Sequence, residues 1–451
     1  MLVKYFVLLF TLVSVSAAVG QSQEDEIREL QRIANEYKER AIKAEALAAR
    51  FEKEAVHARY LYLANEIALY SLQVQDKELA GLLAVQAHQF NLNYSGYPSN
   101  SKIYAGLFNA IKRYRSEQNF SSIHEAKSLV SDSVSIFSIG KDGELFRWTK
   151  NNKEWIGEAL NKVQVNGAIQ AVTLNNQGNL IAIATSDVVQ SNTANIDLVS
   201  IGGQAKRLET LKSKIERIIF SPDGNGLYAL CRSGQLIIHS DFNITREVIK
   251  PIERILSMDI NADGTKLAGL SFSGDLVVWN TSDYSSVVHK IFSKSNEVNS
   301  IAFLPGSKDK IFAASDSALK LIDVNNGQVL RNLLGNPSKI TQIQFSHSGT
   351  LLATLSVDSK IRVWNLKNIR QWPFVIEESL IEGFIFSPDD TQIMSVKDYK
   401  VHSWFLNTRD MANELCGLIK RNLNVEEWNT LISSDLPYVR TCPNLPVKNE
   451  E

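Results

Sequence analysis

The chain contains few of the residues that build metal and redox centres. Its 451 residues include three Cys and seven His. The His residues are scattered at positions 57, 88, 124, 239, 289, 347 and 402, with no pair at metal-ligand spacing, and no Cys-x-x-Cys motif occurs. We therefore expect neither a metal site nor a cofactor.

The common catalytic motifs are also missing. The sequence has no Gly-x-Ser-x-Gly elbow of a serine hydrolase and no Gly-x-x-x-x-Gly-Lys-Ser/Thr loop of an NTPase. Two pairs of acids, Glu377 with Glu378 and Asp389 with Asp390, fall in expected loops and read as solvated turns. These absences predict that the protein is not an enzyme.

Neither sign of charge dominates. The 48 basic and 49 acidic residues leave a formal net charge of −1, which favours neither nucleic acid nor an anionic membrane as a partner. The chain is 44% hydrophobic and long enough for two or three domains. No apolar run beyond the N-terminus is long enough to span a membrane.

Residues 1–20 resemble an export signal. Lys4 gives a positive start, Tyr5 to Val15 form an apolar core, and the small residues Ala18-Val19-Gly20 form a cleavage site before Gln21. The alternative is an uncleaved anchor, but the apolar stretch is shorter than the roughly 20 residues that a membrane helix needs. We expect an exported protein, anchored to the inner membrane only if the signal is retained.

Residues 22–62 follow a heptad pattern. Apolar residues recur every seven positions in two series, which predicts one long helix with a single apolar seam; the series are Ile27, Ala34, Ala41, Ala48, Ala55 and Tyr62, and Leu30, Tyr37, Ala44, Phe51 and Ala58. A helix this long either pairs with a copy of itself or packs along the rest of the chain, and the Ala-rich seam leaves both possibilities open. Residues 63–117 continue as three amphipathic helical patterns.

From residue 118 to residue 408 the chain repeats a unit of three short strands. The third strand ends in a marker position that recurs at intervals of 52, 39, 40, 43, 42 and 40 residues, at Trp148, Ser200, His239, Trp279, Ile322, Trp364 and Trp404. A period near 40 with Trp at the end of the third strand is typical of β-propeller blades. A turn such as Ser221-Pro222-Asp223-Gly224 recurs between the first and second strands. The sequence therefore predicts a mainly β protein with seven blades behind a helical N-terminal part.

At these residues the chain resembles the WD40 family. The resemblance implies a buried blade network of an Asp, a Ser or Thr and a Trp, and its candidate members are Asp142, Trp148, Asp316, Ser356, Asp358, Trp364, Asp398 and Trp404. The chain departs from the family pattern, because the Gly-His pair before each blade is missing and Ser233 and Ser273 replace the Asp in blades three and four.

The segments that flank the repeats resemble a bacterial subgroup of WD40 proteins. The helical run before the blades is similar to the lead-in found beside STAND-type signalling NTPases, although the NTPase is missing here. The tail, residues 409–451, is similar to theirs at Cys416, Arg421-Asn422-Leu423, Glu427-Trp428 and Thr441-Cys442-Pro443. In an exported protein Cys416 and Cys442 are expected to form a disulfide that closes a loop of 27 residues.

These features predict a protein-interaction scaffold in the bacterial periplasm. WD40 proteins commonly bind peptides or domains on the rim made by the turns between second and third strands and by the loops that lead into each blade. The candidate partner-binding residues there are Lys141, Asp142, Arg232, Phe272, Asn296, Glu297, Lys339 and Asp358. The alternatives are an accessory of an envelope secretion or outer-membrane assembly machine, and a propeller hydrolase with substrate in the central channel.

Overall fold

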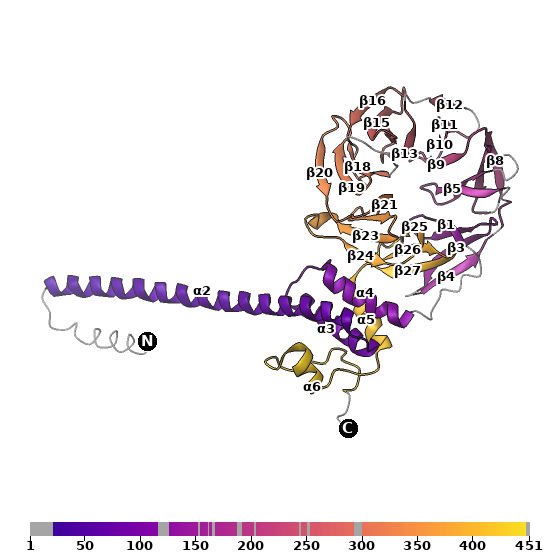
Figure 1. The fold of residues 1–451 in the computed structure, drawn as a ribbon. Helices are drawn as coiled ribbons and strands as arrows, with labels where there is room; N and C mark the ends of the chain where they lie inside the picture. Colours follow the sequence, from indigo (N-terminus) through magenta and orange to yellow (C-terminus); the bar gives the residue numbers. More distant parts are fainter. Residues whose placement is uncertain are drawn as a thin grey trace.

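A computed structural model of the chain describes residues 21–115, 126–151, 154–160, 162–164, 167–186, 192–202, 204–242, 245–249, 253–292 and 300–447. The expected export signal therefore lies outside the described residues. Three parts are visible in Figure 1: a ring of β-sheets, a bundle of helices beside it, and a long helix that projects away from both.

The ring consists of seven antiparallel sheets arranged as blades. Blade one contains β1 (Ala126–Ser131), β2 (Ile136–Gly140), β3 (Leu145–Asn151) and β4 (Glu154–Ala159), and blade two contains β5 (Ala168–Leu174), β6 (Leu180–Ser186), β7 (Ala194–Ser200) and β8 (Ala205–Leu211). Blade three contains β9 (Ile215–Phe220), β10 (Leu227–Cys231), β11 (Leu236–Asp241) and β12 (Thr245–Ile249), and blade four contains β13 (Ile255–Ile260), β14 (Lys266–Ser271), β15 (Asp275–Asn280) and β16 (Ser286–Lys290). In each of these blades the strand order follows the sequence.

The last three blades follow the same plan. Blade five contains β17 (Ile301–Phe303), β18 (Lys310–Ser315), β19 (Ala318–Asp323) and β20 (Val329–Leu333). Blade six contains β21 (Ile340–Phe345), β22 (Leu351–Ser356), β23 (Lys360–Asn365) and β24 (Phe374–Glu377), and blade seven contains β25 (Ile381–Phe386), β26 (Gln392–Lys397) and β27 (Lys400–Phe405). Among the described residues blade seven has three strands, and a short 3-10 helix, η1 (Leu366–Asn368), follows β23. The predicted seven-bladed β-propeller is confirmed.

All seven marker residues lie in the third strands of their blades. Six of them pair with the first buried apolar residue of the second strand, as Trp364 does with Leu352. Blade two differs, because Ile181 of β6 pairs with Val199, so Val199 and not Ser200 occupies the marker position there. The register shifts by one residue, and the buried side chain is that of Val199.

A repeated side-chain bond shapes the turn between the first and second strands. The Oγ of Ser346 accepts a hydrogen bond at 3.1 Å from the backbone N–H of Leu351, five residues later. The same bond links Ser221 to Gly226, Asn261 to Lys266 and Ser387 to Gln392. The fourth turn residue has a positive φ, 65° at Gly349 and 54° at Asp390, which explains why Gly recurs at this position.

Side chains on the innermost strands join one blade to the next. The innermost strand of each sheet is an edge whose free N–H groups need partners. Asp259 on β13 accepts a bond at 2.7 Å from the N–H of Phe303 on β17, and Gln342 on β21 both donates to and accepts from the backbone of Phe384 on β25. The polar residues around the channel thus hold the ring together.

The ring closes between blade one and blade seven through side chains and one backbone bond. The N–H of Ala126 on β1 donates to the carbonyl of Tyr399 at 2.8 Å. The buried indole of Trp155 on β4 donates to the side-chain oxygen of Gln392 on β26 at 2.6 Å, and Lys150 pairs with Asp389 at 2.6 Å.

The helical bundle covers the outer side of blades six and seven. It contains the end of α2 (Gln21–Gln73), α3 (Lys77–Asn93), α4 (Ser101–Arg115) and α5 (Thr408–Leu418). Tyr104 of α4 packs on Phe374 of β24 with ring centres 4.1 Å apart, and Phe108 packs on Trp404 of β27 at 5.5 Å. The helices and these two blades share one hydrophobic core, so the lead-in is part of the folded body.

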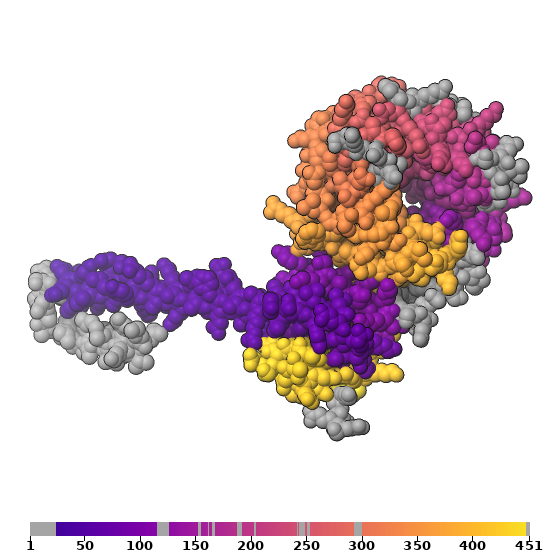
Figure 2. Space-filling model, viewed as in Figure 1, coloured from indigo at the N-terminus to yellow at the C-terminus, as the bar shows by residue number. Residues whose placement is uncertain are grey.

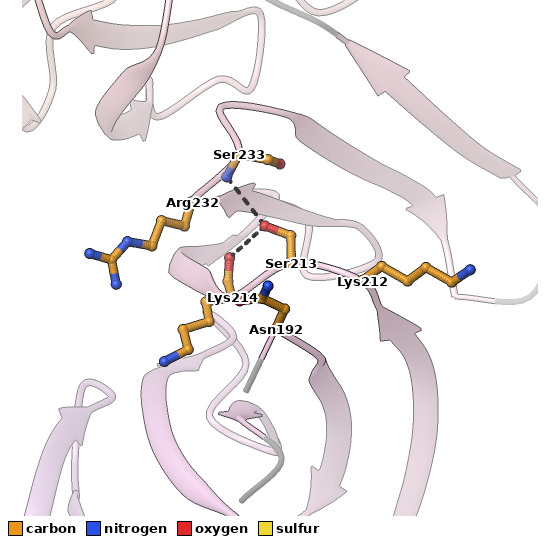
Figure 3. Close-up of a pocket in the computed structure, with 6 residues that line it drawn as sticks. All are labelled: Asn192, Lys212, Ser213, Lys214, Arg232 and Ser233. Atoms are coloured by element: carbon orange, nitrogen blue, oxygen red, sulfur yellow. Dashed lines mark hydrogen bonds between the residues drawn. The ribbon is translucent and has the colours of Figure 1, made fainter. Parts of the chain in front are cut away.

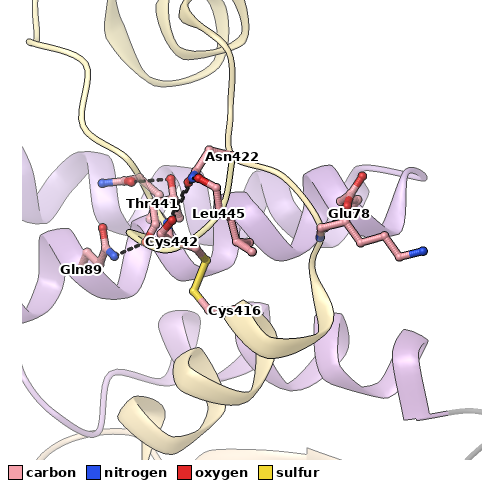
Figure 4. Close-up of a disulfide and its surroundings, with 9 residues drawn as sticks. Glu78, Gln89, Cys416, Asn422, Thr441, Cys442 and Leu445 are labelled. Carbon is pink, nitrogen blue, oxygen red and sulfur yellow. Dashed lines mark hydrogen bonds between the residues drawn. A yellow bond between two sulfur atoms is a disulfide. The ribbon is translucent and has the colours of Figure 1, made fainter. Parts of the chain in front are cut away.

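The C-terminal tail fastens this bundle, as Figure 4 shows. Cys416 on α5 forms a disulfide with Cys442, the predicted pair. The buried Asn422 accepts from the N–H of Cys442 and donates to the carbonyls of Cys442 and Leu445, all at 2.8 Å. Thr441 donates to Gln86 of α3 at 2.8 Å.

The other tail residues singled out by the sequence also hold the tail on the helices. Two short helical segments form in this part of the tail, α6 (Val425–Trp428) and the π-helical η2 (Asn429–Ser433). Arg421 forms two bonds to Glu427 at 2.7 and 2.9 Å, and the indole of Trp428 donates to the carbonyl of Leu436 at 3.1 Å. Each of these side chains therefore has a structural use in holding the tail on the helices.

The predicted blade network forms only in part. Asp142, Asp316 and Asp398 are exposed in their turns. In blade six the buried Arg362 takes the place expected for Trp364: it binds Asp358 at 2.6 and 3.1 Å and Ser356 at 3.4 Å. The indoles of Trp148 and Trp404 donate instead to Ser138 and Ser395, at 2.7 and 2.9 Å.

Candidate functional site

The turns between second and third strands meet the loops that lead into the blades, and together they form one rim of the propeller. Backbone bonds join the two sets: the N–H of Arg232 donates to the carbonyl of Lys214 at 2.7 Å, that of Phe272 to Arg254 at 2.8 Å, and that of Val357 to Lys339 at 2.8 Å. The rim therefore exists as the sequence predicts, while its use as a binding surface stays a prediction.

The candidate rim residues differ in exposure. Lys141, Asp142 and Arg232 are exposed, and Lys339 and Asp358 are half-buried. The ammonium of Lys141 lies 5.7 Å from the ring centre of Tyr399, so it is partly tied to blade seven. Asp358 is bound by Arg362, and this pairing lowers the pKa of Asp358 against the opposing effect of burial. Asn296 and Glu297 lie outside the described residues.

Phe272 lies in a hollow of the rim on blade four. The hollow, about 370 Å³, is lined by Glu253, Arg254, Phe272 and Ser273, and the Phe272 side chain is 49% exposed. Ser273 donates to the carboxylate of Glu253, which lowers the pKa of that carboxyl, and Arg254 pairs with Glu216 at 2.5 Å. The charged groups are thus held by neighbours, and the phenyl ring is left facing solvent.

A second hollow lies next to it on blade three and is basic. Its volume is about 360 Å³, and it is lined by Asn192, Lys212, Ser213, Lys214, Arg232 and Ser233. Figure 3 shows Lys214 and Arg232 extending to the same side, while Lys212 extends away from them. Ser213 holds together the two backbone segments that line this hollow, because its Oγ accepts from the N–H of Ser233 at 3.2 Å and donates to the carbonyl of Lys214 at 3.2 Å.

The two hollows adjoin. A Cβ placed on Gly234, in the turn of blade three, would lie 3.4 Å from the Cα of Arg254 in the other hollow. An exposed phenyl ring and two parallel cations are therefore presented on neighbouring blades of one rim. Such a surface suits a segment that carries an apolar side chain beside an acidic one.

Sequence reasoning found Arg232 and Phe272 but missed their neighbours. Lys212, Lys214 and Arg254 lie in the loops leading into blades three and four, so the same rule applied to those loops would have found them. It also missed three exposed apolar rim residues, Val357, Leu380 and Tyr399, which are 60%, 64% and 42% exposed. These three residues could have been identified from the sequence, because each is an apolar residue inside an expected turn or loop.

The acids on the innermost strands of the described part of the ring each lie near a basic side chain, and they do not form a pair of carboxyl groups arranged for catalysis. Glu216 pairs with Arg254, Glu382 pairs with Lys127 at 2.6 Å, and Asp259 is attracted by Arg217. No group of three or more His, Cys, Asp or Glu that could hold a metal is found among the described residues. Likewise, no helix in the described ranges is long and apolar enough to cross a membrane.

Comparison with known proteins supports the repeat. Residues 327–365, which contain β23, match the family model described as WD domain, G-beta repeat. The chain carries a WD40 repeat. The fold is similar to the WD40 β-propeller domain of Doa1, with a TM-score of 0.50 and 15% identity over 62% of this chain and 92% of that one.

Curated relatives are similar over parts of the chain. They include Protein hir1 of Emericella nidulans, 22% identical over 42% of this chain and 21% of its own, and apoptotic protease-activating factor 1 of Rattus norvegicus, 24% identical over 49% and 17%. COMPASS component SWD3 of Saccharomyces cerevisiae is 20% identical over 44% and 70%. The chain spans about a fifth of the length of the first two, and all three are eukaryotic.

Proposed function

We propose that the protein is a non-enzymatic interaction platform that binds a partner protein on the propeller rim over blades three and four. The observation that carries the proposal is the exposed ring of Phe272 in a hollow beside Lys214 and Arg232. A ring of this kind gains contact area at low entropic cost on binding, and the two cations orient an acidic segment. WD40 propellers generally bind other proteins, which agrees with this role.

The proposal includes export, with the platform in the bacterial periplasm. It rests on the resemblance of residues 1–20 to an export signal and on the disulfide of Cys416 with Cys442, a bond that persists in oxidising compartments. In that setting an accessory role in an envelope machine is one form the platform could take.

The test is quantitative capture from cross-linked envelopes with three forms of the full chain. Phe272→Asp removes the rim ring, and Val287→Asp is the matched control, because Val287 is 56% exposed on the outer strand β16 of the same blade. We expect at least one protein to be recovered by the wild type and by Val287→Asp and to be depleted at least tenfold with Phe272→Asp. Equal recovery by all three forms overturns the rim assignment.

A charge-reversal variant separates the two hollows. Lys214→Glu together with Arg232→Glu places two acids where the proposed partner carries one, so capture is expected to fall and its salt dependence to disappear. Lys102→Glu together with Lys53→Glu, two exposed lysines on α4 and α2, is the control for net charge, because it changes the charge by the same amount. A partner that is retained by the double variant at every salt concentration is not held by this hollow.

A further inference from the structure

The projecting part of α2 is unlike the rest of the molecule, because no other helix or strand of the described residues packs on its apolar side chains. Figure 2 shows it standing clear of the body. Residues 24–56 are exposed apart from three that are half-exposed, and the large seam residues Leu30, Tyr37 and Phe51 are 47%, 62% and 59% exposed. Among the described residues, packing along the rest of the chain, one of the two possibilities left by the sequence, therefore does not occur over this stretch.

The seam continues on a free face where α2 reaches the body. Tyr62 is still 64% exposed, while Ala64 and Ile67 are buried. At about 100° per residue, these two side chains lie about 200° and 140° around the helix from Tyr62. The body is thus packed on the side opposite Tyr62, and the described part of the fold leaves the seam open to a partner.

We propose that a second copy of this chain pairs with the first along this seam, in an antiparallel two-helix coiled coil centred between Ile42 and Lys43. In that arrangement each large seam residue between Ile27 and Ala58 lies opposite an Ala of the other copy. The layers are Ile27 with Ala58, Leu30 with Ala55, Ala34 with Phe51, Tyr37 with Ala48, and Ala41 with Ala44.

Side-chain volume decides the direction. A parallel pair in register would put Tyr37 on Tyr37 and Phe51 on Phe51 of the two copies, with layers of two Ala between them. The aromatic layers would then hold the helices apart and leave gaps at the Ala layers, whereas protein interiors pack densely. The antiparallel pairing gives, on each side of two central layers of two Ala, four layers of one large and one small side chain.

The charges beside the seam agree with this pairing. Lys38 lies opposite Glu45 of the other copy, and twofold symmetry makes that contact twice; both side chains are exposed in the single chain. The ion pairs of Arg32 with Glu29 and Glu36, at 2.6 and 2.9 Å, lie on the outer face, away from the seam. The rod formed by Ile27–Ala58 is about 48 Å long at 1.5 Å per residue, with one propeller at each end.

The first test is the mass of the full chain by sedimentation equilibrium. The wild type is expected at twice the monomer mass and Phe51→Glu at the monomer mass. Ile42→Glu is the matched control, because Ile42 is 56% exposed on the same helix but off the seam; it is expected to stay dimeric. A monomeric wild type, or equal masses for the Phe51 and Ile42 variants, overturns the proposal.

The second test fixes the direction by disulfide trapping between differently substituted copies. Lys38→Cys mixed with Glu45→Cys is expected to give a covalent heterodimer in high yield. Arg40→Cys mixed with Glu45→Cys, the neighbouring pair of a parallel coil, is expected to give at least tenfold less. The reverse order of yields overturns the antiparallel pairing. Cys231, 1% exposed inside blade three, serves as the unreactive background in both mixtures.

Discussion

At the scale of single residues, the polar side chains of this protein act mainly as connectors. Gln342 and Asp259 satisfy N–H groups of the neighbouring blade, and Asn422 alone makes three bonds that hold the tail. None of these bonds follows from local sequence, because each partner lies 20 or more residues away. The sequence could place Asn422 in a motif but could not say what it holds.

His88 on α3 gives the helical bundle a pH dependence. The imidazole is buried with Arg409 nearby, and both lower its pKa to about 4, burial being the larger cause. In the unfolded chain the pKa returns to about 6.5. Between these values the unfolded chain binds a proton that the folded chain does not, so the free energy of unfolding falls as the pH decreases from about 6.5 towards 4.

We expect the wild type to lose about 2 kcal/mol more than His88→Leu between pH 8 and pH 5. Urea unfolding followed by circular dichroism at the two pH values measures both losses. The difference between the proteins isolates His88 from the carboxyl groups that they share. Equal losses in the two proteins would show that His88 is not buried in its neutral form.

At the scale of elements, the strands were more predictable than their contacts. Seven third strands were found from one marker position, because each blade repeats the same burial on a period near 40 residues. The predicted marker is off by one residue at Ser200, since the 52-residue interval before it contains inserted residues that hide the register. The long helix was also predictable from its heptads, but the sequence could not tell a free seam from a packed one.

The disulfide of Cys416 with Cys442 is the main element-level constraint on the tail. It closes 27 residues that contain α6 and η2, and chain-entropy reasoning gives such a bond about 3.5 kcal/mol of stabilisation. We expect reduction, or Cys442→Ser, to lower the unfolding free energy of the helical bundle by roughly this amount. Hydrogen exchange measured by mass spectrometry should show faster exchange in α3 and the tail.

Exchange in blades three and four is the internal control, because these blades share no core cluster with the bundle. Acceleration there equal to that in α3 would mean that the disulfide stabilises the whole chain as one unit. Unchanged exchange everywhere would mean that the other tail bonds suffice without it.

At the scale of the whole molecule, stability depends on the closure between the first and last blades. The buried Trp155 is 6% exposed and bonds to Gln392 across that junction. Trp155→Ala is expected to cost about 3–5 kcal/mol, because it leaves a cavity and an unsatisfied amide oxygen. Denaturant unfolding measures the loss.

Trp372→Ala serves as the comparison, because that indole is 68% exposed and its removal should change stability by less than about 1 kcal/mol. A similar loss for both variants would mean that the ring does not depend on this junction. The marker spacing predicted seven blades, whereas the residues that close them could not be predicted, because residue 155 and residue 392 meet only after the ring has formed.

The central claim is that partners bind over blades three and four, and a photo-crosslinking amino acid at position 272 tests it most directly. In living cells the account predicts a discrete covalent adduct from position 272, lost when Lys214 and Arg232 are both reversed in charge, and no adduct from position 287 on the outer strand of the same blade. Adducts at 287 and none at 272 would contradict it.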